Sequence, residues 1–143
     1  MIIGGDWNAK VGRNREGRER VMGKYGFGER NDRGERLLDF ASQHDMVICN
    51  TRYQQKDCRK WTWRSNDGKT KNMIDMILIQ KRWVTAIQQC RTYQGADVDS
   101  DHSLVIANMQ LKLKRKRRLA YQKQCDSTQL KDAILGANYR RLL

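Results

Sequence analysis

"NMIDMILI", residues 72–79, is an apolar run that contains one carboxylate, that of Asp75. Its length, its content of Ile, Leu and Met and the turn-forming residues before it predict a buried strand. An ionised carboxylate among such side chains costs several kcal/mol unless a donor pairs with it. We therefore expect a strand with a paired aspartate, and His102 is the available donor.

Two further apolar stretches carry polar residues at one end. The apolar start of the chain runs into two glycines and is followed by Asp6 and Asn8, as expected for a strand that ends at a loop. Asp101 and His102 directly precede the apolar residues 103–107. Each predicted strand thus has an acid, an amide or an imidazole inside it or at its end.

These side chains could form a hydrolytic site. If Asp75 accepts a hydrogen bond from one ring nitrogen of His102, it fixes the tautomer, raises the imidazole pKa and leaves the other nitrogen for a substrate. Asp101 would point to the other side of the extended backbone, where a hard cation such as Mg²⁺ could use it. Asp6 could take a proton from an attacking water, and Asn8 could donate to a phosphate oxygen. Together they predict metal-assisted hydrolysis of a phosphodiester.

Each of these patterns also has a structural interpretation. An aspartate in a strand beside a histidine is most often a structural hydrogen-bonded pair. The "GDWN" of residues 5–8, taken alone, is as typical of a turn capped by an aspartate. The occurrence of all the patterns in one chain, in this order, favours catalysis.

The charge of the chain indicates a polyanionic partner. Its 143 residues include 29 Lys and Arg against 16 Asp and Glu, which gives a net charge of +13 and a pI near 10.0. Lysine and arginine side chains that neutralise phosphates release condensed counterions, so nucleic acid is the leading partner. An acidic membrane surface would attract the same charge. The longest apolar run is too short to cross a bilayer, so we expect no membrane-spanning segment.

The cysteines do not predict a metal site. They are widely and irregularly spaced, with no CxxC or CxxH pair. The start of the chain has no signal peptide pattern, which indicates a reduced, intracellular compartment. We expect free thiols at all four positions, Cys49, Cys58, Cys90 and Cys125.

The first half of the chain predicts a loop, a helix and a strand. Residues 13–36 are rich in glycine and in charges of both signs, as a long mobile surface loop would be. The pattern of residues 31–45 predicts a helix whose start is capped by Asp32 and Glu35. A short buried strand is expected over residues 46–51.

The second half predicts a hairpin, a last strand and a separate tail. Residues 61–64 and 72–79 are expected to pair across a turn. Alternation in residues 103–113 predicts a strand with one wet face. Six of the seven residues 112–118, "KLKRKRR", are basic and cannot pack together. We therefore divide the chain into a domain of residues 1–113 and a basic linker with a helical tail, residues 114–143.

The motifs resemble those of a known superfamily. In order, they are similar to the last motifs of the endonuclease/exonuclease/phosphatase superfamily, which includes apurinic endonucleases and deoxyribonuclease I. Three stretches, residues 31–51, 74–83 and 91–105, most resemble the endonuclease domains of RTE-type non-LTR retrotransposons and the craniofacial development protein 2-like proteins derived from them. The resemblance rests on "GGDWNAKVG" (4–12), "KWTWRSNDG" (60–68), "NMIDMILI" (72–79) and "SDHSLV" (100–105).

The resemblance implies an α/β fold, a four-layer α/β sandwich with mostly antiparallel sheets and a site at their shared edge. In that family, the residue matching Asp6 activates the nucleophile and the one matching Asn8 binds the phosphate. The residue matching Asp75 orients the histidine matching His102, which faces the scissile phosphate. The residue matching Asp101 helps to hold Mg²⁺, or Mn²⁺ in its place.

The same resemblance implies that this chain is the C-terminal half of the domain, with the N-terminal half absent. The family's domain is about twice as long, and its first half supplies an Asn and a Glu that bind the metal. We therefore expect weak Mg²⁺ binding, and an exposed apolar sheet face that a partner covers. Little or no nuclease activity is expected from the chain as a truncated product.

Two classes of function follow. The first is Mg²⁺-dependent hydrolysis of DNA by a retrotransposon-derived, apurinic-endonuclease-like domain. The alternative is a non-catalytic basic module that binds nucleic acid through residues 112–118, a segment that also fits a nuclear localisation signal or a solvated linker. A phosphatase for small phosphoesters would share the chemistry but lacks support from the retrotransposon-like motifs. On these grounds we expect an intracellular, nuclear protein.

Overall fold

The computed structural model describes residues 1–96 and 99–113. The chain divides into two units, Met1–Lys112 and Leu113–Leu143, and the first of them contains all the strands and helices described below. The predicted helical tail, most of the basic segment 112–118 and Cys125 lie outside the described residues.

The apolar run that contains Asp75 forms the central strand of the main sheet. This strand, β5 (Asp75–Gln80), lies between β1 (Ile2–Asp6) and β2 (Met46–Ile48), and both neighbours are antiparallel to it. A central position buries both faces of a strand, and this explains why the sequence of β5 is apolar almost throughout.

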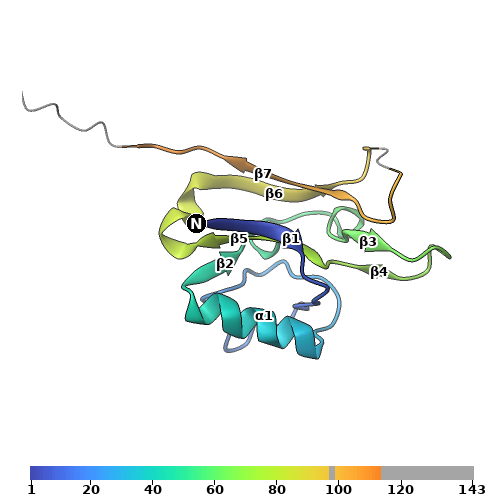
Figure 1. Cartoon of the computed structure of the whole chain (residues 1–143), viewed down its shortest axis with the longest axis horizontal. Coiled ribbons are helices and arrows are strands. Elements are labelled where there is room, and N and C mark those ends of the chain that lie inside the picture. The colour runs from blue at the N-terminus through green and yellow to red at the C-terminus, as the bar shows by residue number, and fades with distance from the viewer. Residues whose placement is uncertain (97–98, 114–143) are drawn as a thin grey trace, which may run out of the picture. The chain divides into compact units, whose positions relative to one another are not determined.

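The two faces of β5 contact two different layers. Met76 and Leu78 belong to a core cluster with residues of α1 (Asp32–Gln43), whereas Ile79 belongs to a second cluster with residues of β6 (Ile87–Tyr93) and β7 (Leu104–Met109). Successive side chains of a strand point to opposite faces, so one strand serves both cores. Figure 1 shows the result, with α1 on one side of the sheet and β6 and β7 on the other.

The helix α1 begins where the sequence predicts, but with a different cap. Its N-cap is Asn31, whose side chain accepts hydrogen bonds from the backbone amides of Gly34 (2.8 Å) and Lys10 (3.0 Å). The predicted capping pair of Asp32 and Glu35 is therefore wrong. Asn31 is the cap instead, because its side-chain oxygen accepts from one backbone amide at the start of the helix and from one in the loop that follows β1.

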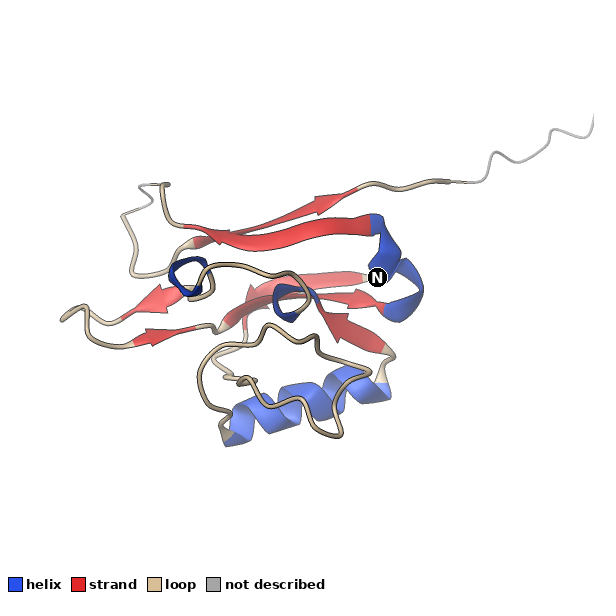
Figure 2. Cartoon of the chain, turned by 180° about the vertical axis from the view of Figure 1, so that it is seen from behind, coloured by secondary structure: helices blue, strands red, loops and turns tan. Residues whose placement is uncertain are grey.

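The loop before α1 packs on the core through some of its residues, so residues 13–36 are only in part the surface loop that the sequence predicts. Val11, Val21 and Met22 are at most 4% exposed and belong to the same core cluster as α1. Arg18 and Arg30 both pair with Glu35 of the helix. Figure 2 shows this loop lying beside α1. Its charged residues thus hold the segment on the helix.

The predicted hairpin of residues 61–64 and 72–79 is correct only in part. The turn exists, but the strands on either side of it are short, β3 (Trp63–Arg64) and β4 (Lys71–Asn72). The chain then leaves this small sheet, and β5 pairs with β1 and β2 instead. In the larger sheet the buried strand β5 has a paired strand on each side. In a two-stranded hairpin it would have only one.

The last two strands form an antiparallel pair, β6 (Ile87–Tyr93) and β7 (Leu104–Met109). The strand β6 was not predicted from the sequence. The strand β7 ends at Met109, and Leu111 and Leu113 are 51% and 74% exposed, so its predicted extension to residue 113 is wrong. The remaining elements are short 3₁₀ helices at Cys49–Thr51, Asp57–Arg59 and Lys81–Ala86.

The fold class is as predicted, mixed α/β with mostly antiparallel sheets. A single parallel bridge joins Met22 and Ile48 in the described residues. Cys49, Cys58 and Cys90 are free. Among the residues that the structure describes, no helix has the length and apolar character that a membrane crossing requires.

Candidate functional site

The pairing of β1 with β5 brings two carboxylates together. Asp6 is the last residue of β1 and lies directly opposite Asp75, the first residue of β5. Directly opposed residues of an antiparallel pair project from the same face. Two like charges in this position repel each other, so the register requires a cationic partner between or beside them.

His102 supplies one such partner. Its Nδ1 lies 2.9 Å from Oδ2 and 3.2 Å from Oδ1 of Asp75, so the pairing expected from the sequence is present. The side chains of Asp75 and His102 are 19% and 33% exposed. Nδ1–H donates to the carboxylate in this arrangement, which leaves Nε2 for a ligand.

The charge state of His102 follows from its neighbours. Burial alone lowers the pKa of His102, but the hydrogen bond to Asp75 and the charges of Asp75, Asp101 and Asp6 outweigh burial. The pKa of His102 is therefore raised above its usual value. At a given pH the imidazolium, with N–H donors on both nitrogens, is therefore more populated than in a histidine without these neighbours.

Two buried polar side chains fix the backbone on either side of Asp75. Oγ1 of Thr62 accepts from the amides of Ile74 and Asp75, both at 3.0 Å. The side-chain amide of Asn50 donates to the carbonyl of Asp75 (3.1 Å) and accepts from the amide of Ile77 (2.9 Å). Thr62 and Asn50 were not predicted from the sequence. The only signal was that each is a polar residue beside apolar ones.

The turn after β1 presents Asn8. Its backbone amide donates to Oδ1 of Asp6 at 2.8 Å, and its φ is 47°, in the left-handed region. Trp7 holds the turn, because its backbone amide donates to the carbonyl of Ile74 and its indole N–H to that of Met76, both at 3.0 Å. A non-glycine residue in this conformation is strained, and such strain is common at functional sites.

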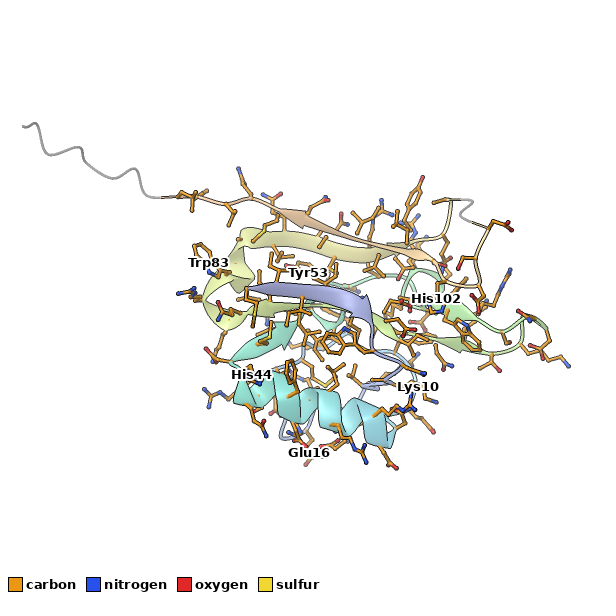
Figure 3. The ribbon with its side chains drawn as sticks, viewed as in Figure 1. Lys10, Glu16, His44, Tyr53, Trp83 and His102 are labelled. Atoms are coloured by element: carbon orange, nitrogen blue, oxygen red, sulfur yellow. The ribbon has the colours of Figure 1, made fainter. Side chains whose placement is uncertain are left out.

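Asp6, Asn8 and His102 open into a common cleft of about 330 Å³. Figure 3 shows His102 and Lys10 at the same end of the molecule. A second cavity of about 690 Å³ lies beside it, and His102 lines both. The cleft is lined by Asp6, Asn8, Lys10, Asn31, Trp63, Asn72, Ile74 and His102.

Asp101, the predicted metal ligand, lies next to this group and not within it. Its carboxylate Oδ2 accepts a hydrogen bond of 2.7 Å from Nε1 of Trp63. It lines the larger cavity together with His102. Of the predicted residues, the structure thus gathers Asp6, Asn8 and His102 at one cleft, with Asp75 paired to the histidine.

Two carboxylates and the imidazole beside them form a group of side chains that fits a divalent cation. Asp6, Asp75 and His102 each offer one ligand atom, and the three atoms lie within 4.8 Å of one another. Carboxylate oxygens are the ligands that Mg²⁺ and Mn²⁺ prefer, and imidazole is acceptable to the softer of the two. Asp75 can pair with His102 or bind a cation, and these two uses compete for its oxygens.

Sequence comparison identifies relatives of this chain. Craniofacial development protein 2 of Tragulus javanicus is 44% identical over 114 residues, which are 80% of this chain and 20% of that protein. The same protein of Bos taurus is 43% identical over 114 residues, 80% of this chain and 19% of that protein. The chain therefore spans about a fifth of the length of the curated relatives it matches.

Comparison of structures and of family profiles agrees with these relatives. The endonuclease domain of TRAS1, a telomere-specific non-LTR retrotransposon, has a similar fold, with a TM-score of 0.51 at 19% identity. The similarity covers 78% of this chain and 44% of that chain. The profile of the family described as "Endonuclease-reverse transcriptase" matches residues 1–106. The chain thus belongs to the endonuclease-reverse transcriptase family, within the endonuclease/exonuclease/phosphatase fold that its motifs predict.

Proposed function

We propose that the cleft beside Asp6 and His102 is a metal-dependent site for hydrolysis of DNA phosphodiesters. The observation that carries the proposal is the convergence of Asp6, Asp75 and His102, from β1, β5 and the segment just before β7, to within 4.8 Å. A structural ion pair needs one acid and one base. A second carboxylate opposite the first is costly for a fold and useful for binding a cation.

The roles of the protein side chains follow from their contacts. Asp75 holds Nδ1 of His102, so Nε2–H of the imidazolium is free to donate to a non-bridging phosphate oxygen. Oδ1 of Asp6 accepts from the amide of Asn8, which leaves Oδ2 to take the proton of an attacking water. The side-chain amide of Asn8 is free to donate to a second phosphate oxygen.

Because Asp75 is paired with His102, a cation would be held by Asp6 together with Asp101, the ligand that the resemblance implies, and a bound Mg²⁺ or Mn²⁺ would supply Lewis-acid stabilisation of charge on the phosphate. Two carboxylates are fewer protein ligands than a defined octahedral site requires. We therefore propose weak cation binding and low activity for the described residues.

The experiment is cleavage of an end-labelled duplex oligonucleotide by the purified chain with Mg²⁺ or Mn²⁺. Loss of cleavage in Asp6→Asn, with cleavage retained in Asp32→Asn, supports the proposal. Asp32 is an exposed acid in the first turn of α1 and does not line the cleft. Cleavage by Asp6→Asn at the rate of the unmodified chain would show that another group activates the water.

A second candidate is a non-catalytic basic module that binds DNA. The observation that favours it is the net charge of +13, with six basic residues among residues 112–118. If this segment binds phosphates, its deletion lowers the slope of log affinity against log salt by roughly one for each phosphate that the segment neutralises. We also propose that residues 112–118 act as a nuclear targeting signal.

A protein partner is proposed to cover exposed apolar side chains such as Ile2 and Leu104.

A further inference from the structure

Trp63 contacts a residue of the proposed site through its indole nitrogen. Nε1–H donates to Oδ2 of Asp101 at 2.7 Å. Trp63 is half-buried and lines the same cleft as Asp6 and His102. It belongs to neither of the two core clusters, so its indole is available for a role at the cleft.

The backbone around Trp63 is bonded to the same segment. Trp63 forms an antiparallel bridge with His102. The amide of Arg64 donates to the carbonyl of Asp101 at 3.0 Å, and the amide of Ser103 donates to the carbonyl of Thr62 at 2.6 Å. The main chain of Asp101 is therefore fixed, and the indole then selects the orientation of its carboxylate.

We propose that Trp63 is a positioning residue that holds the Asp101 carboxylate in one rotamer so that its other oxygen serves the site. Asp101 is exposed, and without a partner its short side chain would sample several rotamers. Among the described residues, Oδ1 of Asp101 has no hydrogen-bond partner. That oxygen is the one available to a divalent cation, and this last step rests on the function proposed above.

The chemistry of indole explains why a tryptophan suits this position. An arginine could orient a carboxylate equally well, but its positive charge would offset the negative charge of the carboxylate that attracts a cation. Indole is a neutral donor with one N–H and no acceptor, so it fixes Asp101 and leaves the full negative charge in place. The indole N–H of Trp7, by contrast, bonds the carbonyl of Met76 and has a purely structural partner.

The test uses the full chain labelled with ¹⁵N and ¹³C. Each of the four tryptophans gives one indole N–H signal, which single Trp→Phe variants assign. We expect Asp101→Asn to shift the signal of Trp63 and to leave that of Trp7 in place. Three-bond couplings to Cγ of Asp101 should report one χ1 rotamer in the unmodified chain and in Trp61→Phe, and rotamer averaging in Trp63→Phe. Trp61 is the matched control, since it lies two residues away and makes no bond to Asp101 in the described residues.

The second measurement is Mn²⁺ affinity from the free Mn²⁺ signal in electron paramagnetic resonance. Trp63→Phe is expected to weaken binding several-fold, and Trp61→Phe to leave it unchanged. An unmoved Trp63 signal in Asp101→Asn or an unchanged Asp101 rotamer in Trp63→Phe would overturn the proposal. So would equal Mn²⁺ affinity of the two tryptophan variants, if the unmodified chain binds the ion. If the unmodified chain binds no Mn²⁺ while Trp63→Phe still releases the Asp101 rotamer, the positioning role stands and the proposed function fails.

Discussion

Asp6 and Asp75 face each other across the antiparallel pair of β1 and β5, and His102 reaches Asp75 from the segment just before β7. Three segments that are far apart in the sequence thus place two acids and an imidazole around one point. The sheet register fixes the first two, and the contact between β3 and residues 101–103 fixes the third. Pairing between segments that are distant along the chain therefore determines the geometry of these three side chains.

The pKa of His102 depends on Asp75. Because the carboxylate holds the pKa of His102 above its usual value, Asp75→Asn is expected to lower it. The measurement is the ¹H–¹⁵N titration of the imidazole in a His44→Gln background, where His102 is the one remaining histidine. The same pKa in both chains would contradict the pairing.

That pairing also makes stability depend on pH. A histidine whose pKa is higher in the folded than in the unfolded state stabilises the fold below its unfolded pKa, and this contribution is lost as the pH rises through the folded pKa. The loss of stability in Asp75→Asn is therefore expected to be larger at about pH 5.5 than at about pH 8.5. Urea denaturation at the two pH values measures the difference, and equal losses would be evidence against a charged pair.

Thr62 is expected to stabilise the fold through its hydroxyl. It is 0% exposed, and its Oγ1 accepts from two backbone amides. Thr62→Val keeps the shape but leaves both amides without an acceptor, at a cost of about 2 kcal/mol or more in the free energy of unfolding. Thr62→Ser keeps the hydroxyl and should lose much less. Equal stability of the Val and Ser variants would argue that the amides find other acceptors.

Gly34 is expected to resist substitution although it lies in a helix. A Cβ at this position would lie 1.8 Å from the carbonyl oxygen of Lys10. Alanine normally favours a helix over glycine by about 1 kcal/mol. We nevertheless expect Gly34→Ala to lower the melting temperature, because α1 must move away from Lys10. Gly5→Ala is the control, since nothing lies within 4 Å of its Cβ. A higher melting temperature for Gly34→Ala would show that the contact relaxes freely.

Asn8 is expected to contribute to the site through its side-chain amide, at a backbone position that suits glycine. Its φ of 47° suits glycine, so Asn8→Gly should be more stable than Asn8→Ala by about 1 kcal/mol. Both variants lack the side-chain amide, and both should lose DNA cleavage. Urea denaturation and the oligonucleotide assay check the two parts. Cleavage retained in Asn8→Gly would remove Asn8 from the proposed phosphate contact.

The parts of the fold that were predicted correctly are those that local chemistry determines. A carboxylate inside an apolar run has to be paired, and this argument alone related Asp75 to His102. The strand β6 was missed because Gln88, Gln89 and Arg91 interrupt its apolar pattern, and pairing with β7 compensates for them. The burial of residues such as Val21 depends on contacts with α1, which no local pattern reveals.

For the candidate site, the sequence indicated some of the residues but not the groups that support them. Residue type and position identified Asp6, Asn8, Asp75, His102 and Asp101 as candidates. The supporting groups Thr62 and Asn50 were not identified, because their role depends on which backbone groups lie opposite them. Hydrogen bonds between segments that are distant along the chain leave no periodic signal in the sequence.

The most direct test of the proposed site is the nicking of supercoiled plasmid by the full chain with Mg²⁺ or Mn²⁺, compared between His102→Ala and His44→Ala. His44 is the C-cap of α1 and does not line the cleft, so it is the matched histidine control. We predict nicking that falls about 100-fold or more in His102→Ala and persists in His44→Ala. Equal nicking by both variants would contradict a phosphodiester-hydrolysing site at His102.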